Sequence, residues 1–123
     1  MNKLTLPLLV LMAAGCALAE DSFAGAWKIE GDVAGNAVQE SCTLKQDGGK
    51  ITGSCKGLGG DKAWEVTGSV EGGAVTFQHG GEYNGEALTL IYKAKLDDKG
   101  ALKGTIDVKP FDVAGEFTAK KDQ

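Results

Sequence analysis

Residues 42–55 read CTLKQDGGKITGSC, and this stretch decides the register of one strand pair. Apolar and polar residues alternate on both sides of Gly48-Gly49, which is the pattern of two β-strands joined by a two-residue turn. That turn places Cys42 opposite Cys55 in a pair without ladder hydrogen bonds, where the Cα atoms are about 4.5 Å apart. A disulfide spans such a distance. The turn and the two cysteines therefore predict the same hairpin.

The same alternation continues through the rest of the chain. Gly72-Gly73 and Asp98-Lys99-Gly100 interrupt it as turns would, and no window has the period of a helix. Because the connections are short, neighbouring runs should pair antiparallel. The pattern predicts an all-β fold, an up-and-down antiparallel β-barrel of about eight strands with one cross-strand disulfide. The expected strands are residues 26–33, 37–46, 50–57, 62–71, 74–79, 87–96, 101–109 and 113–120.

Four of these runs carry a glycine at their centre, in ITGSC (51–55), VTGSV (66–70), LKGTI (102–106) and VAGEF (113–117). All four glycines fall on the apolar face, which should point inward. We expect them to permit the bends that close a small sheet into a barrel, with the Phe77 ring covering Gly68. The rest of the predicted inward face is Trp27, Ile29, Cys42, Leu44, Ile51, Cys55, Trp64, Val66, Val70, Val75, Leu88, Leu90, Tyr92, Leu96, Leu102, Ile106, Val108, Val113 and Phe117.

The first residues have the features of an export signal. Lys3 is followed by an apolar run too short to span a membrane, and small residues typical of a cleavage site end at Ala19. Residues 1–19 are therefore interpreted as a signal peptide cleaved after Ala19, and residues 20–123 as a single barrel domain, periplasmic or secreted. Cys16 leaves the alternative of a lipoprotein acylated at that residue. No later stretch is apolar for long enough to form a membrane-spanning helix.

Composition narrows the class of protein further. The chain has 13 basic residues, all of them lysine, against 17 acidic residues, for a net charge of −4 at pH 7. Nucleic-acid binding needs a basic surface, so nucleic acid is excluded as a partner. In an exported chain Cys42 and Cys55 are expected to pair, and the pair alone offers too few ligands for a metal. Neither a metal nor another cofactor is predicted.

Three motifs resemble the calycin superfamily of lipocalin-like and avidin-like barrels. GAWKI (25–29) is similar to the G-x-W that begins their first strand, and GKITGSC (49–55) and WEVTGSV (64–70) are similar to the paired strands of avidin-like chains. The resemblance implies a barrel that binds a small molecule, with a lysine replacing the arginine that lipocalins stack on the first-strand tryptophan, here Trp27. It does not extend to a biotin site. Export, size and disulfide also resemble the bacterial metalloprotease-inhibitor barrels, which act through a longer trunk ahead of the barrel.

The candidate ligand contacts are mostly aromatic. The rings of Trp27, Trp64 and Tyr92 either line a cavity or simply fill the core. Tyr83 belongs to HGGEYNGE (79–86), the longest polar connection between expected strands, and loops at one end of a barrel often carry binding residues.

His79 is the single histidine and points inward at the predicted end of its strand. It either touches a ligand at the barrel mouth or lies there half in water. With Glu82 it supplies at most two metal ligands, too few for a structural zinc.

Two functions from different classes fit these features. The first is a monomeric, non-enzymatic carrier of a small apolar molecule. The second is a protein-interaction module with a filled barrel, such as a periplasmic protease inhibitor or an envelope accessory protein. Catalysis is not expected, because Ser41, Ser54 and Ser69 point outward with no base beside them and the sequence shows no converging titratable groups.

Overall fold

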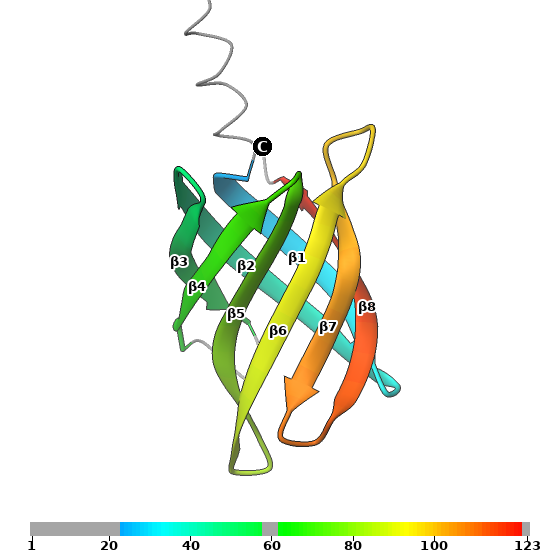
Figure 1. The fold of residues 1–123 in the computed structure, drawn as a ribbon. Coiled ribbons are helices and arrows are strands. Elements are labelled where there is room, and N and C mark those ends of the chain that lie inside the picture. Colours follow the sequence, from blue (N-terminus) through cyan, green and yellow to red (C-terminus); the bar gives the residue numbers. More distant parts are fainter. Residues whose placement is uncertain (1–22, 58–61, 122–123) are drawn as a thin grey trace, which may run out of the picture.

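The computed structural model describes residues 23–57 and 62–121, which form one closed antiparallel β-barrel (Figure 1). Each strand pairs with its neighbour in sequence, and β1 pairs with β8 to close the barrel. The predicted up-and-down fold is confirmed. The strands are β1 (Gly25–Val33), β2 (Asn36–Asp47), β3 (Lys50–Lys56), β4 (Trp64–Glu71), β5 (Ala74–Tyr83), β6 (Glu86–Leu96), β7 (Leu102–Lys109) and β8 (Val113–Lys121).

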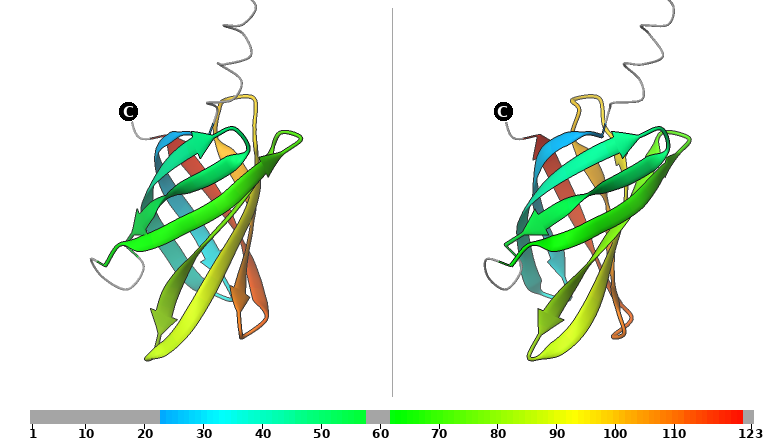
Figure 2. Two further views of the ribbon diagram at one scale, coloured as in Figure 1. Left: turned by 60° about the vertical axis from the view of Figure 1, so that its left-hand side comes forward. Right: turned by 90° about the vertical axis from the view of Figure 1, so that its left-hand side faces the viewer.

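The two ends of the barrel differ in their connections. The hairpins β1–β2, β5–β6 and β7–β8 turn at one end, and the hairpins β2–β3, β4–β5 and β6–β7 turn at the other (Figure 1). The β5–β6 hairpin projects well past the ends of β3 and β4 (Figure 2). The end at which this hairpin turns is called the open end below.

The predicted registers are confirmed. Cys42 faces Cys55 across β2 and β3, and the two form a disulfide. Gly68 faces Phe77 across β4 and β5, and Tyr92 faces Ile106 across β6 and β7. A period-two pattern with one buried face fixes such pairings, because a one-residue slip would turn every apolar side chain outward.

The central glycines are required by the close approach of the neighbouring strand. A Cβ atom on Gly104 would lie 2.7 Å from the Cα of Ala94, and one on Gly68 would lie 2.7 Å from both Cα and Cβ of Phe77. Neither glycine has a positive φ. What glycine supplies at these two positions is therefore space for the adjacent backbone.

The prediction of a long polar loop over residues 79–86 is wrong. β5 continues to Tyr83, and the connection is the two-residue turn Asn84-Gly85, whose φ angles of 52° and 80° suit a hairpin turn. Gly80, which suggested a loop, lies inside β5 because the Trp64 ring packs there, 3.0 Å from where a Cβ would be. The extra residues lengthen the β5–β6 hairpin.

The barrel centre is filled by side chains. The rings of Phe77 and Tyr92 stack with centroids 4.7 Å apart, and Phe117 meets Tyr92 edge-on at 5.2 Å. Most of the predicted inward residues are buried, while Trp64, Val70, Leu88, Leu96 and Val113 are only partly so. The buried residues that the pattern did not predict are Phe23, Val33, Val38, Glu40, Gly81, Ala94 and Ala119.

The expected signal peptide and Cys16 lie outside the described residues. Over residues 23–57 and 62–121, no helix has the length and apolar character needed to cross a membrane.

Candidate functional site

The open end of the barrel carries an apolar pocket of about 490 Å³. The hairpins β1–β2, β5–β6 and β7–β8 supply its walls, and its lining includes the buried Val38, Leu90 and Val108. The remaining lining residues are Val33, Ala34, Asn36, Ala37, Glu82, Tyr83, Leu88, Phe111 and Val113.

Two aromatic side chains of this pocket are exposed to solvent. Tyr83 is 53% exposed and Phe111 is 44% exposed, and they are the exposed large hydrophobic residues of the described chain. Both stand in or beside the hairpins that form the pocket. Large apolar side chains held in water at the edge of an apolar pocket are typical of a binding site.

The outer wall carries a different kind of depression, of about 610 Å³, over β1, β7 and β8. Its lining includes Glu30, Asp32, Lys103 and Glu116, which are charged. Four of its nine lining residues are therefore charged, whereas Glu82 is the single charged residue among those that line the pocket at the open end, and small-molecule sites are mostly apolar. The pocket at the open end is the better candidate.

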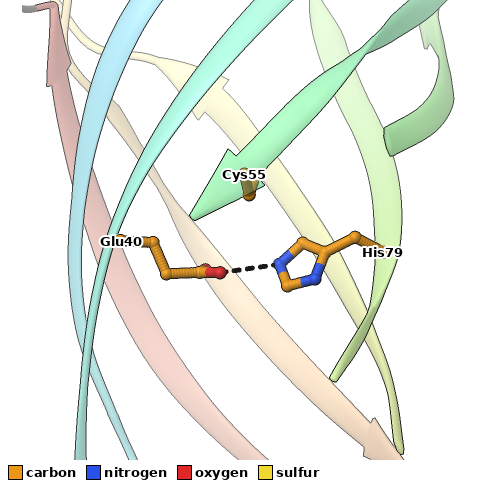
Figure 3. A group of neighbouring side chains, drawn as sticks. All are labelled: Glu40, Cys55 and His79. Carbon is orange, nitrogen blue, oxygen red and sulfur yellow. Dashed lines mark ion pairs between the residues drawn. The ribbon is translucent and has the colours of Figure 1, made fainter. Parts of the chain in front are cut away.

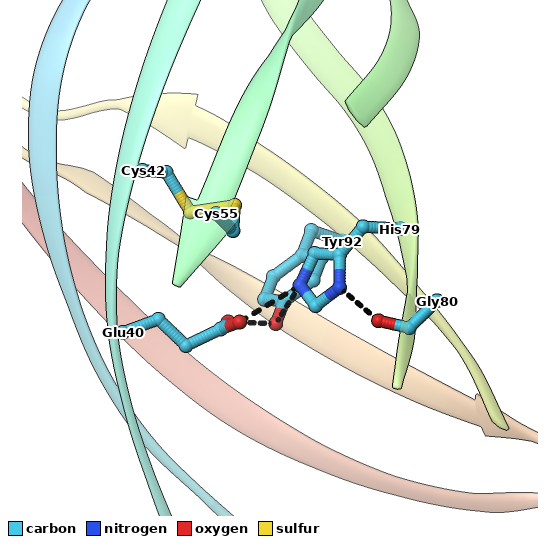
Figure 4. Close-up of polar contacts among 6 residues, drawn as sticks. All are labelled: Glu40, Cys42, Cys55, His79, Gly80 and Tyr92. Atoms are coloured by element: carbon cyan, nitrogen blue, oxygen red, sulfur yellow. Dashed lines mark hydrogen bonds and ion pairs between the residues drawn. A yellow bond between two sulfur atoms is a disulfide. The ribbon is translucent and has the colours of Figure 1, made fainter. Parts of the chain in front are cut away.

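Beneath the pocket lies a buried polar cluster of Glu40, His79 and Tyr92. Glu40 is two residues along β2 from the pocket residue Val38, and His79 pairs with the pocket residue Leu90. The side chains of Glu40 and His79 have no accessible surface. The Tyr92 hydroxyl donates to Glu40 Oε1, and His79 Nε2 lies 2.9 Å from Glu40 Oε2 and 3.1 Å from Tyr92 Oη (Figure 4).

The hydrogen-bond partners of His79 determine where its protons lie. Nδ1 is 2.5 Å from the Gly80 carbonyl oxygen, which can only accept, so Nδ1 carries a proton. On its other side Nε2 faces Glu40 Oε2 and the Tyr92 oxygen, whose own proton is already donated to Glu40. Without a further proton, the lone pairs of His79 Nε2 and Glu40 Oε2 would face and repel each other. One proton therefore lies between Nε2 and Oε2.

The environment raises the pKa of His79 above its ordinary value of 6.5. Burial alone would lower that pKa, but the hydrogen bond to Glu40, the charge of Glu40 and the bond to the Gly80 carbonyl together outweigh burial. The raised pKa favours the protonated form of His79 beside Glu40. Burial, followed by the charge of Glu40 and the hydrogen bond to it, raises the pKa of the Tyr92 hydroxyl, which stays neutral.

The disulfide lies beside this cluster. Cys55, on β3, has its Sγ within 4.8 Å of ligand atoms of Glu40 and His79, and all three residues are buried (Figure 3). The three come from β2, β3 and β5, so that the barrel closure brings them together.

The five predicted ligand contacts occupy different places. Tyr83 lines the pocket, whereas His79 and Tyr92 belong to the buried cluster. Trp27 is 1% exposed, and its Nε1 donates to the Phe23 carbonyl. Trp64 is half-buried, with the Lys62 ammonium 4.2 Å from its ring centroid.

The expected position of His79 needs correction. His79 lies in the middle of β5, because the strand continues to Tyr83, and it is neither at the barrel mouth nor half in water. Its carboxylate partner is Glu40 on another strand and not the sequence neighbour Glu82, which lines the pocket.

Sequence reasoning missed Glu40 and Phe111. Glu40 had a usable signal, because it shares the inward parity of Val38 and Cys42, and an acidic residue on an apolar face calls for a buried partner. Phe111 lies in the connection between β7 and β8, where periodicity carries no information.

Comparisons with protein-family models, with curated proteins and with solved structures give no match for this chain.

Proposed function

We propose that the protein is a non-enzymatic barrel that binds one small apolar molecule, neutral or cationic, in the pocket at its open end. The observation that carries this proposal is the exposed aromatic pair at the pocket, Tyr83 and Phe111. Exposing these rings costs free energy in the unliganded protein, and a ligand that covers them recovers it.

The size and lining of the pocket support a small ligand. A volume of about 490 Å³ lies within the roughly 300–1,000 Å³ of typical small-molecule sites. The filled barrel centre leaves the ligand at the mouth, above Val38 and Leu90, and not deep inside the barrel.

The charge of the pocket favours a neutral or cationic ligand. Glu82 is the charged residue among its lining residues, and no lysine lines it. The nearby Lys109 is engaged with Asp112 at 2.6 Å. Among the described residues that line the pocket a fatty-acid carboxylate would find no cation, whereas an amine on an apolar body could pair with Glu82.

Binding is favoured over catalysis because the titratable groups that converge, Glu40, His79 and Tyr92, do not line the pocket. A general acid or base must come within hydrogen-bond reach of its substrate.

We further propose a calycin-type, exported monomer. The calycin type is supported by the Lys121 ammonium, which lies 5.5 Å from the Trp27 ring centroid. Export is supported by the disulfide.

A protein-interaction module is the second candidate, favoured by the packed centre of the barrel. In that case Tyr83 and Phe111 would anchor a partner protein, since exposed aromatic residues are frequent interface hot spots.

Fluorescence titration with a neutral apolar dye such as Nile red tests the proposal. We expect one dye per chain and a blue-shifted emission, with the affinity at least about tenfold lower in the double variant Tyr83→Ser/Phe111→Ser, which removes the apolar rim. Palmitate should compete poorly, and a hydrophobic amine should compete well in the wild type but less well in Glu82→Gln.

The matched control is Asp98→Asn, at the opposite end of the barrel, which should bind the dye like the wild type. The proposal fails if the wild type binds neither dye nor amine, or if the double variant binds as tightly as the wild type. Absence of binding together with capture of a protein through the same two aromatic residues would establish the second candidate.

A further inference from the structure

The interior of the barrel brings together four side chains that ligate metals. Glu40 on β2, Cys55 on β3 and His79 on β5 place one ligand atom each within 4.8 Å of one another (Figure 3). Cys42 is bonded to Cys55 and lies two residues from Glu40 on the same inward face of β2. All four residues are at most 5% exposed.

We propose that the reduced form of this barrel binds one zinc-type divalent cation through Cys42, Cys55, His79 and Glu40, and that disulfide formation abolishes the site. Two thiolates, one imidazole nitrogen and one carboxylate oxygen are the ligand types that Zn²⁺ takes in tetrahedral sites. In the disulfide neither sulfur is a thiolate, so only the reduced chain offers the full set.

The orientation of His79 supports this assignment independently. Its Nδ1 donates to the Gly80 carbonyl, and this bond turns Nε2 toward Glu40 and the Tyr92 hydroxyl (Figure 4), with Cys55 Sγ within 4.8 Å of the ligand atoms of His79 and Glu40. Histidines that ligate metals characteristically donate the second ring N–H to a backbone carbonyl or a carboxylate. The imidazole is thus held in the pose that a ligand needs.

Glu40 supplies a second observation. Its Oε2 is fully buried and has no hydrogen-bond partner except the proton that it shares with His79. A buried ion pair generally stabilises a fold no better than two apolar side chains of similar size. Packing alone therefore does not explain an acid at this inward position. A cation that replaced the shared proton would bind the lone pairs of Glu40 Oε2.

A dithiol reductant transfers two electrons and two protons to Cys42–Cys55, giving two thiols and the oxidised, cyclic disulfide of the reductant. Binding of Zn²⁺ then releases both thiol protons, together with any proton that His79 Nε2 still carries. The disulfide is buried, with Cys42 at 1% and Cys55 at 0% exposure, so reduction requires an opened or unfolded chain. The metal would therefore enter during folding.

Cobalt binding to the reduced protein tests the proposal. The protein is unfolded in denaturant with a dithiol, then refolded without oxygen in the presence of Co²⁺. We expect one Co²⁺ per chain with a thiolate charge-transfer band and the visible bands of tetrahedral cobalt, displaced by Zn²⁺. Zinc-coupled refolding near pH 7 should release about two protons, those of the two thiols, because histidine is largely neutral and carboxylates are ionised in an unfolded chain at this pH. Calorimetry in buffers of different ionisation enthalpy measures the release. The protein with its disulfide intact should show none of these signals.

Variants separate this site from adventitious binding to the thiols. Glu40→Gln and His79→Gln should each weaken Co²⁺ binding at least about tenfold, while Glu65→Gln, on the exposed face of β4, should leave it unchanged. If the reduced chain folds only with metal, zinc-dependent recovery of the β-sheet spectrum becomes the readout, and the same two variants must weaken it. The proposal is overturned if the reduced protein binds no Co²⁺, folds neither with nor without zinc, or binds equally well in all variants.

Discussion

The centre of the barrel and its open end are built from the same strands, but they differ in their contact with water. At the centre, Phe77, Tyr92 and Phe117 pack ring against ring and are at most 3% exposed. At the open end, Tyr83 and Phe111 are 53% and 44% exposed. Changes at the centre should therefore be measured as lost stability, and changes at the open end as lost binding with stability nearly unchanged.

The largest loss of stability is expected where two strands approach most closely. Gly104→Val places side-chain atoms against the backbone of Ala94 and should lower the free energy of unfolding by about 3 kcal/mol or more. Denaturant unfolding followed by circular dichroism measures the loss. The matched control is Thr105→Val on the exposed face of the same strand, which should stay within about 0.5 kcal/mol of the wild type. Equal stability of the two variants would contradict the close-approach explanation.

Removing one member of the buried ion pair should lower the free energy of unfolding by a similar amount. Glu40→Ala leaves the His79 imidazole buried without its carboxylate, and the expected loss is about 3–5 kcal/mol. Glu82→Ala removes an acid from the open end and should cost no more than about 0.5 kcal/mol. Urea unfolding of both variants makes the comparison. Similar losses for the two would show that the centre and the open end do not differ as described.

Loss of the disulfide should lower the free energy of unfolding somewhat less than loss of the buried ion pair. Replacing Cys42 and Cys55 together by alanine releases a cross-link between residues 13 positions apart, and the expected loss is about 2–4 kcal/mol. Thermal unfolding of the wild type and of the double variant, both without reductant, measures it. An unchanged melting temperature would contradict a structural role for the bond.

Stability should also depend on pH through His79. Because its pKa is raised in the folded protein, the stabilisation is complete below the unfolded value of about 6.5 and is lost as pH rises through the folded value. Tyr92, whose pKa is also raised, faces the same carboxylate and acts in the same direction only above about pH 10. Urea unfolding of the disulfide-intact protein from pH 5 to 9 measures the trend.

Glu40→Gln should reverse this pH dependence. Without the carboxylate, burial becomes the main influence and lowers the pKa of His79, so stability should fall as pH drops below about 6.5. If the free energy of unfolding changed with pH in the same direction in the wild type and in Glu40→Gln, Glu40 would not set the charge of His79.

The sequence predicts the barrel and its registers well, because a turn such as Gly48-Gly49 and a pattern of period two leave one pairing that buries the apolar face. It predicts the sites poorly. Glu40 and His79 meet only when β2 and β5 are placed across the barrel from each other, and that contact is not local in sequence. The pocket depends on the length of the β5–β6 hairpin, which the glycines at 80 and 81 concealed.

The smallest change in stability is expected at the open end. Tyr83→Ser/Phe111→Ser removes exposed rings that make few core contacts, so the free energy of unfolding should change by about 0.5 kcal/mol or less per substitution. Urea unfolding measures this change. A loss above about 2 kcal/mol would mean that the rings support the fold and do not serve binding.

The most direct test of the central claim is an NMR titration of the methyl-labelled protein with a neutral apolar ligand. We predict saturable shifts confined to methyl groups at the open end, such as those of Val33, Leu88 and Val113, with the central Val75 and Ile106 unmoved. Shifts centred on Val75 and Ile106, or no shifts at any ligand concentration, would contradict the assignment of binding to the open end.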